Sequence, residues 1–325
     1  MKASYRVIVI GGGHAGVEAA WAAANLLGEP GSVALVTLDP GTIGVMSCNP
    51  AIGGLAKGQL AREVDALNGI MGLAADASGI MFKVLNTSRG PAVRGPRCQN
   101  DKEAYAEAVQ KLIAGRREID IIAGAVDEFV IESGRIAGVR VSPPQTKKPL
   151  SASSICAAAA QAAGRDHAFE TPAEAIELRA PAVVLTTGTF MRGLMHTGDD
   201  RTPGGRHGEA PAVGISAALS GLGFELGRLK TGTPPRLDIT TIDWACLPQP
   251  PGDDEPIPFS DLTDPATFPA IEQVSCRQTH TTPFIHDLIR ANLHRAPIFS
   301  GQVDGTGPRY CPSIEDKVHR FDRDQ

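Results

Sequence analysis

A glycine-rich turn between an apolar run and an alanine-rich stretch constrains the fold of this chain more than any other feature. Residues 5–10, YRVIVI, are typical of a strand buried on both faces. The sequence GGGHAG follows at once, and the alanine-rich residues 14–27, which end before Gly28, predict a helix. A strand, a GxGxxG turn and a helix in this order predict a Rossmann-like dinucleotide-binding unit.

Each glycine of the turn has a predicted role. Gly11 permits the bend, Gly13 lets the backbone approach a pyrophosphate, and Gly16 lets the helix pack on the strand. The helix N-terminus attracts the anion. A second strand, residues 33–38, leads to Asp39, whose carboxylate is placed to bind a ribose hydroxyl. The alternative for Asp39 is an ordinary loop aspartate before Pro40.

A second glycine-containing loop, residues 47–54, has the sequence SCNPAIGG. The backbone N–H groups of Gly53 and Gly54 could hold a phosphate or a ring carbonyl. A helix with apolar residues at Leu60, Val64 and Leu67 is predicted to follow. Disulfide reductases that use FAD place a C-x4-C pair in this region, whereas Gly53 stands five residues after Cys48, which disfavours a dithiol reductase.

The middle of the chain predicts a basic loop, a helix and a hairpin. Arg89, Arg94 and Arg97 lie among glycines and prolines, so they either bind phosphate or are solvated loop charges. A helix is expected at residues 102–114, and strands at 119–141 with a turn at 132–135. Residues 142–175 have little helix or strand pattern and are expected to form a partly mobile surface insertion.

The strand expected at residues 182–190 ends at Thr187 and Gly188. In flavoproteins with two dinucleotide motifs such a strand closes the first nucleotide domain, which supports FAD. Residues after 201 are expected to form a second unit, in which lysine and arginines beside glycines at 202–207 and 227–236 suit a phosphate-bearing partner. The prolines between 247 and 269 predict an irregular segment outside the core.

Composition sets outer bounds. The 325 residues carry a formal charge of −5, which excludes a uniformly positive nucleic-acid-binding surface, although a basic cleft is still possible. No apolar run is long enough to span a membrane, and the start lacks a cleavable hydrophobic segment, so we expect a cytoplasmic protein. The six cysteines are scattered and the eight histidines lack metal-site spacing, so we expect reduced thiols and no metal.

Cys311 stands between Tyr310 and Pro312 in the sequence GPRYCPSIEDK, residues 307–317. Because proline fixes its own φ and restricts the preceding residue, Cys311 is expected in an extended or turn conformation.

Several segments together resemble the MnmG (GidA) family, the FAD-dependent subunit of a tRNA wobble-uridine modification enzyme. The resemblance rests on GGGHAG, MSCNPAIGG, AKGQL with EVDAL, GPAVR, TGTF, GRLKTGTPPR and GPRYCPSIEDK. It covers nearly the whole chain except the insertion at 142–175. Family members continue for several hundred residues beyond the segment matched here, with a further flavin-binding segment and a helical domain for tRNA and partner.

The resemblance implies an α/β fold: a Rossmann-like FAD-binding domain of the GR2 type, decorated by a β-hairpin, with an inserted second α/β domain. The expected boundaries are 1–200 for the FAD domain, with a β insertion at 126–182, then 201–295 for the NAD(P)H or substrate domain. Residues 296–325 are expected to return to the FAD domain.

The function that the resemblance implies is addition of a carboxymethylaminomethyl or aminomethyl group to carbon 5 of the wobble uridine. A cytoplasmic homodimer would work with an MnmE-like GTPase, as a heterotetramer, on tRNA. Methylene-tetrahydrofolate would supply the carbon, glycine or ammonium the nitrogen, and NADH the hydride through FAD. The alternatives are an NADH-dependent flavin oxidoreductase acting on a small molecule and an inactive, truncated nucleotide-binding module.

The resemblance also implies site residues. The FAD pyrophosphate would be held by Gly11, Gly12, Gly13, His14, Ala15 and Gly16, and the backbone of Val126 would contact adenine. The residues matching a segment assigned to NAD contact are Gly307, Pro308, Arg309, Tyr310, Pro312, Ser313, Ile314, Glu315, Asp316, Lys317, Val318, His319, Arg320 and Phe321.

The two thiols tied to activity by the resemblance are Cys311 and Cys48. A thiolate can attack carbon 6 of uracil, which makes carbon 5 nucleophilic toward an iminium carbon before the adduct is released. Cys311 is the first candidate and Cys48 the second, and a packed, inert cysteine is the alternative for each. Glu315, Asp316 and Lys317 could tune the thiol or act in acid–base chemistry.

Overall fold

The computed structural model describes residues 3–144, 150, 152–234, 236–302 and 313–325. Its α-helices are α1 (His14–Leu27), α2 (Lys57–Ala66), α3 (Met71–Ser78), α4 (Lys102–Ala114), α5 (Ser154–Ala162), α6 (Gly214–Gly221), α7 (Pro283–Ala291) and α8 (Ile314–Arg320). Its strands are β1 (Val7–Ile10), β2 (Val33–Thr37), β3 (Ala51–Gly53), β4 (Gly79–Leu85), β5 (Gly95–Asn100), β6 (Ile119–Ala123), β7 (Ala125–Glu132), β8 (Arg135–Ser142), β9 (Ile176–Arg179), β10 (Val183–Leu185), β11 (Leu194–Thr197) and β12 (Asp200–Pro203).

The central sheet is parallel and has the strand order β10-β1-β2-β6. Ile10 of β1 lies opposite Leu185 on one side and Val36 on the other. The chain runs from β1 through β2 to β6 and then returns to β10 on the other flank of β1. The strand order therefore reverses beside β1, which is the position where doubly wound sheets bind their ligands.

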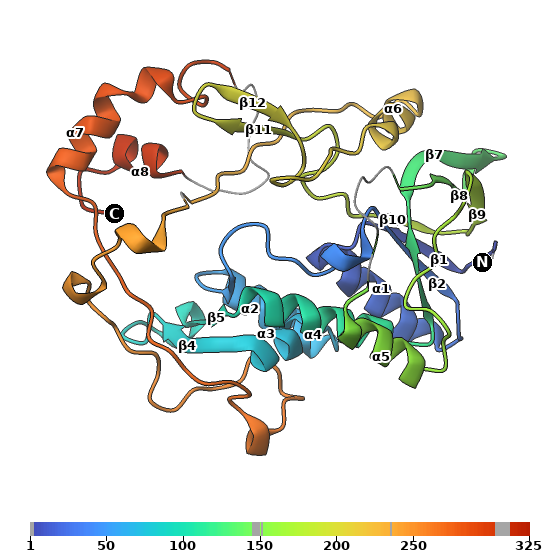
Figure 1. Cartoon of the computed structure of the whole chain (residues 1–325), viewed down its shortest axis with the longest axis horizontal. Coiled ribbons are helices and arrows are strands. Elements are labelled where there is room, and N and C mark those ends of the chain that lie inside the picture. The colour runs from blue at the N-terminus through green and yellow to red at the C-terminus, as the bar shows by residue number, and fades with distance from the viewer. Residues whose placement is uncertain (1–2, 145–149, 151, 235, 303–312) are drawn as a thin grey trace.

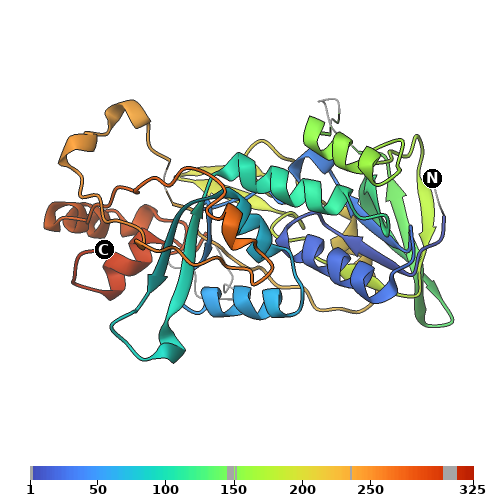
Figure 2. The same cartoon turned by 90° about the horizontal axis from the view of Figure 1, so that it is seen from below.

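Each face of this sheet is covered by a different layer. Val9 packs in a core with α1, α4 and α5, whereas Ile8 and Ile10 pack in a second core with the antiparallel sheet β7-β8-β9, because successive strand residues point to opposite faces. The three helices lie on one side of the strands (Figure 1), and Figure 2 looks onto that side. This arrangement confirms the predicted Rossmann-like α/β fold.

The β7–β8 hairpin and the helices around it agree with the sequence. The hairpin turns at Ser133 and Gly134, as expected from residues 132–135. Helix α6 packs on β7, where a Cβ on Gly214 would lie 2.6 Å from the Asp127 carboxylate, and Ile215 is fully buried in the same core. Gly214 and Ile215, which the sequence prediction placed in the second domain, therefore pack against the hairpin of the FAD domain. The described part of 201–295 forms one strand and two α-helices, and the domain boundaries remain a prediction.

The insertion at 142–175 contains a helix that its composition did not predict. Ser153 caps α5 by accepting the backbone N–H of Cys156, and Cys156 and Ala160 are buried beside α4. Arg165 follows and donates to the backbone carbonyl of Arg116 at 2.8 Å. Alanine is a strong helix former, and its small side chain lets α5 pack closely on α4, so the expected lack of regular structure is wrong for residues 154–162.

A second sheet, β3-β5-β4, is antiparallel and lies beside α2 and α3. The helix predicted after the second glycine loop is present as α2, but its buried residues are Gly58, Ala61 and Asp65. Leu60 and Leu67 are 58% and 82% exposed. Their spacing therefore predicted the helix correctly but did not predict which of its faces is buried.

The proline-rich segment (residues 247–278) is irregular, as predicted, but part of it enters the core. Phe259 is 1% exposed and belongs to the main hydrophobic cluster. The segment lies along β4, where Asp253 N donates to Phe82 O at 2.9 Å and Val274 N to Ile80 O at 2.7 Å. The expectation that this segment lies outside the core is therefore wrong at Phe259.

Helices α7 and α8 lie at the end of the molecule away from the N-terminus, and the β11–β12 hairpin lies between α7 and α6 (Figure 1). No helix in the described part of the chain combines the length and apolar character needed to cross a membrane.

Candidate dinucleotide site and the Cys48 loop

The glycine-rich turn adopts the geometry that its sequence predicts. Gly11 has φ +112°, and a Cβ there would lie 2.3 Å from the carbonyl oxygen of Thr186. Thr186 Oγ1 donates to the carbonyl of Ile10 at 2.7 Å, which ties the end of β10 to the end of β1. A residue with a side chain therefore cannot replace Gly11 without separating the two strands.

Gly16 and Gly13 differ in what surrounds them. A Cβ on Gly16 would lie 1.7 Å from the carbonyl oxygen of Gly11, so α1 packs against the turn only because residue 16 is glycine. A Cβ on Gly13 would meet nothing within 4 Å, and Gly13 caps α1 without a side-chain hydrogen bond. The N-terminus of α1 thus presents open space and a positive dipole end, which fit a pyrophosphate.

His14 is the first residue of α1 and stacks on Tyr105 of α4, with 5.4 Å between ring centroids. Burial lowers the pKa of His14, which favours its neutral form at neutral pH. The imidazole therefore packs the helix against α4 and adds no full charge to the pyrophosphate position. Its backbone, at the N-terminus of α1, is the part that suits the anion.

Asp39 and Val126 lie at neighbouring strand ends. Asp39 Oδ1 accepts the backbone N–H of Gly41 at 2.8 Å, so this oxygen caps the turn that follows, as an ordinary loop aspartate would. Val126 is 7% exposed and pairs with Val141 in the hairpin. The proposed ribose and adenine contacts of these two residues remain predictions.

The backbone N–H groups of Gly53 and Gly54 do not form the pair of donors that the sequence suggested. Gly54 N donates to Pro96 O at 2.8 Å, and Gly53 lies opposite Arg97 in the β3–β5 ladder. The Gly54 N–H is therefore already used inside the protein, and the expectation of a two-donor ligand site is wrong there.

Two arginines from distant segments hold the loop that carries Cys48. Arg236 Nη2 donates to the Cys48 carbonyl at 3.1 Å, and Arg206 Nη1 donates to Ser47 Oγ at 3.3 Å. Arg206 also pairs with Glu209, so its charge is partly neutralised within the protein. The sequence predicted a phosphate-bearing partner for these arginines, which remains a prediction, and the structure places both at the loop of the half-buried Cys48.

Helix α8 carries the described part of the predicted NAD segment. Asp316 is 6% exposed and pairs with Lys230 at 3.2 Å, and Val318 is 1% exposed. His319 packs edge-on against Phe299. Three of these side chains are therefore committed to packing or pairing, while Cys311 and the candidates at 307–310 and 312 lie outside the described residues. The NAD contacts and the role of Cys311 remain predictions.

The fold and the turn at Gly11 to Gly16 define a protein of the Rossmann-like, dinucleotide-binding class. The family described as "Glucose inhibited division protein A" matches residues 6–163 and 170–325. The chain therefore belongs to the glucose inhibited division protein A (GidA) family, which confirms the resemblance to MnmG (GidA).

Named relatives agree with this family. The chain is 48% identical over 322 residues to the tRNA uridine 5-carboxymethylaminomethyl modification enzyme MnmG of Rhodopirellula baltica. The aligned region covers 98% of this chain and 44% of the relative. It is also 48% identical to the MnmG of Granulibacter bethesdensis, over 98% of this chain and 45% of that relative. The chain thus spans about half the length of the curated relatives it matches.

A solved relative has the same fold. The form I crystal structure of Aquifex aeolicus GidA superimposes with a TM-score of 0.79 at 43% identity, over 98% of this chain and 48% of that chain. At this level of similarity the two chains share the fold described above.

Proposed function

We propose that this chain carries the nucleotide-binding part of a FAD-dependent enzyme that modifies the wobble uridine of tRNA at carbon 5. The group added is carboxymethylaminomethyl or aminomethyl. The observation that carries the proposal is the match of 98% of the chain, at 48% identity, to relatives named for this reaction. The dinucleotide cradle at Gly11 to Gly16 supplies an independent physical support.

The cradle fits FAD. Gly13 leaves room for the pyrophosphate, and the N-terminus of α1 stabilises its negative charge. The backbone at Val126 and the carboxylate of Asp39 lie at the strand ends where adenine and ribose would be held. FAD, when bound, would pass a hydride from NADH to the carbon unit that becomes part of the modified base. The protein's own task is to hold and orient the dinucleotide.

The loop at Cys48 would bring a thiol to the same reaction. Arg236 bonds the Cys48 carbonyl and Arg206 bonds the Ser47 hydroxyl, which supports a fixed place for this loop. A thiolate placed there would add to carbon 6 of uracil and activate carbon 5. Cys311 is the other thiol proposed for this step.

The remaining participants are proposed from the family. Methylene-tetrahydrofolate would supply carbon, and NADH would supply the hydride. An MnmE-like GTPase would assemble with a homodimer of the complete protein, in the cytoplasm, on tRNA.

Deletion of the gene for the complete protein tests the function. We expect nucleoside mass spectrometry of total tRNA to show loss of the C5-modified wobble uridine, and a plasmid copy to restore it. A Cys48→Ser copy should restore less than wild type if Cys48 takes part in the reaction. Unchanged modification in the deletion strain would contradict the proposal, and rapid NADH turnover without tRNA would favour a small-molecule oxidoreductase.

A further inference from the structure

The proline-rich segment (residues 247–278) forms a closed loop whose two ends meet. Gln278 N donates to Pro248 O at 3.0 Å, and Arg277 Nη1 donates to Leu247 O at 3.0 Å. The middle of the loop is anchored on the core through Phe259, and both arms are bonded to β4. The neck where the ends meet is therefore held by the body of the protein.

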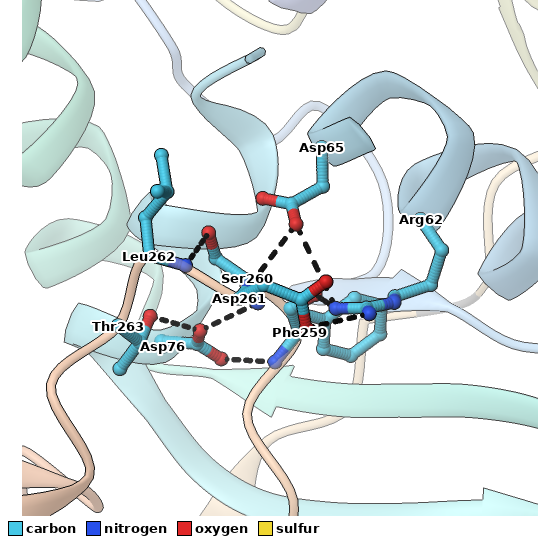
Figure 3. A network of polar contacts seen from close by, with 8 residues as sticks. All are labelled: Arg62, Asp65, Asp76, Phe259, Ser260, Asp261, Leu262 and Thr263. Atoms are coloured by element: carbon cyan, nitrogen blue, oxygen red, sulfur yellow. Dashed lines mark hydrogen bonds and ion pairs between the residues drawn. The ribbon is translucent and has the colours of Figure 1, made fainter. Parts of the chain in front are cut away.

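Polar side chains fix the middle of this loop. Asp76 accepts the backbone N–H groups of Phe259 and Ser260 at 2.7 and 2.9 Å. Asp65 accepts Asp261 N at 3.1 Å, and Arg62 donates to the carbonyl of Phe259. Figure 3 shows these side chains converging on the backbone of the loop. The middle of the loop is thus fixed on α2 and α3, although it has no regular secondary structure of its own.

A shallow groove that is largely open to solvent lies at the neck. Its lining includes an indole, a guanidinium, two side-chain amides, a hydroxyl and a thiol, from Trp244, Arg277, Gln249, Gln273, Ser275 and Cys276. Trp244 is 43% exposed, although tryptophan is a residue that proteins usually cover. Gln273 Nε2 donates to the carbonyl of Gly79 at 2.7 Å, which fixes the plane of that amide at the groove wall.

The charge of the groove is positive at Arg277. Burial raises the pKa of the Cys276 thiol, and the nearby Arg97 opposes that rise, so the thiol contributes no negative charge at neutral pH. Asp243, next to Trp244, accepts hydrogen bonds from Ala245 N and Cys246 Sγ, and its charge is held within that turn. The groove therefore combines a flat aromatic face, a cation and polar amides.

We propose that this groove binds one unpaired nucleotide of the RNA substrate, with the base stacked on the indole of Trp244 and a phosphate on the guanidinium of Arg277. Base stacking on an aromatic ring, with arginine on the backbone, is how proteins hold single-stranded RNA. The net charge of −5 disfavours extended contact with a duplex, whereas a single stacked base needs little positive surface. This inference rests on the proposed function and adds a contact outside the dinucleotide site.

The two tryptophans of the chain permit a direct test. Trp21 donates to Asn68 O at 2.9 Å and is covered by the guanidinium of Arg116 at 4.4 Å, so its ring face is occupied. In a Trp21→Phe chain the fluorescence comes from Trp244 alone. We expect a uridine-rich RNA heptamer to quench it saturably, because stacking on a base quenches indole emission.

Affinity is measured by anisotropy of the same heptamer carrying fluorescein. We expect Trp244→Ala to weaken binding about 5- to 150-fold and Trp244→Phe to retain most of it, since one stacked base contributes that range. Arg277→Gln should reduce the slope of log K against log salt by about 0.7, the value for one phosphate on a single strand. Arg135→Gln, in the exposed hairpin at the far end of the molecule (Figure 1), is the matched control and should leave the slope unchanged.

Three results would overturn this inference: no quenching by RNA, equal affinity of the wild-type and Trp244→Ala chains, or quenching by NADH that RNA does not displace. The last result would assign the groove to a free dinucleotide. None of these results contradicts the proposed function if the deletion strain lacks the modified uridine. The experiments therefore test nucleotide binding at the groove and the proposed function separately.

Discussion

The carboxylate of Asp76 on α3 accepts the backbone N–H of Phe259 at 2.7 Å, although 183 positions separate the two residues. Its other oxygen accepts Ser260 N at 2.9 Å and the hydroxyl of Thr263 at 2.5 Å. Asp76 is 2% exposed. One buried carboxylate therefore satisfies three donors of the proline-rich segment and lets Phe259 enter the core without secondary structure of its own.

Replacing Asp76 by asparagine is expected to lower the free energy of unfolding by about 1–3 kcal/mol. The amide keeps one acceptor oxygen but points an N–H₂ group at buried donors. Urea unfolding followed by circular dichroism measures the change. Asp261→Asn is the control, because Asp261 pairs with Arg62 through a side chain that is 82% exposed, and its loss should cost less than about 1 kcal/mol. Equal effects of the two changes would contradict the assigned role of Asp76.

The same carboxylate predicts a pH dependence. Burial raises the pKa of Asp76 above its ordinary 3.8, and hydrogen bonds from Thr263, Phe259 and Ser260 oppose the rise. Between the ordinary and the raised value the folded state binds more protons than the unfolded state, so stability falls as pH rises. We expect the stability of wild type relative to Asp76→Asn to be greatest below pH 3.8 and to decline through the raised pKa. Urea midpoints at several pH values check this, and a difference that grows with pH would contradict it.

The sequence predicted the dinucleotide unit well because its signals are local. A β-branched strand, glycines at 11, 13 and 16 and an alanine-rich helix each act within a few residues. Contacts between distant residues were not predictable in the same way. Nothing in the pattern around Asp76 or Phe259 shows that the two meet, and the arginines at 206 and 236 have glycine and proline neighbours typical of phosphate loops. Arg236 meets the Cys48 carbonyl and Arg206 meets the Ser47 hydroxyl, and these contacts depend on the three-dimensional path of the chain.

Gly16→Ala and Gly13→Ala form a matched pair that separates folding from cofactor binding. The Gly16 Cβ would lie 1.7 Å from a backbone carbonyl, so Gly16→Ala should destabilise the protein by roughly 1–3 kcal/mol or more. Gly13 has φ −75° and open space around its Cβ position, so Gly13→Ala should fold normally. Because that space is where a pyrophosphate fits, we expect Gly13→Ala to weaken FAD binding at least tenfold, measured by quenching of flavin fluorescence in the complete protein. Normal flavin affinity in Gly13→Ala would contradict the placement of the cradle.

Thiol labelling tests which cysteines are accessible. Cys98 and Cys156 are 0% and 4% exposed, and burial raises the pKa of both thiols. Iodoacetamide followed by peptide mass spectrometry should modify them only after denaturation. Faster labelling of Cys98 than of the half-buried Cys48 in the folded protein would contradict the structure.

Cys246 is exposed but restrained in a different way. Its thiol donates to Asp243 Oδ2 at 2.9 Å, and this hydrogen bond raises the pKa of Cys246. Asp243→Asn removes the negative charge that holds the proton. We expect the alkylation rate of Cys246 at pH 7 to rise severalfold while that of Cys276 stays constant as an internal reference. An unchanged rate at Cys246 would show that Asp243 does not hold this proton in solution.

The ion pair between Lys230 and Asp316 joins α8 to the segment 227–236, so its removal should show how much this contact stabilises the protein. The Asp316 side chain is 8% exposed and the Lys230 side chain 23%, so Lys230→Met leaves a buried carboxylate without its nearest cation. We expect a loss of about 1–3 kcal/mol in urea unfolding, partly recovered in the double variant Lys230→Met/Asp316→Asn. Arg290→Met breaks the exposed pair with Asp322 and should cost less than about 1 kcal/mol. Recovery in the double variant would identify Asp316 as a structural member of α8. Unchanged stability in Lys230→Met would instead leave that carboxylate for the predicted NADH contact.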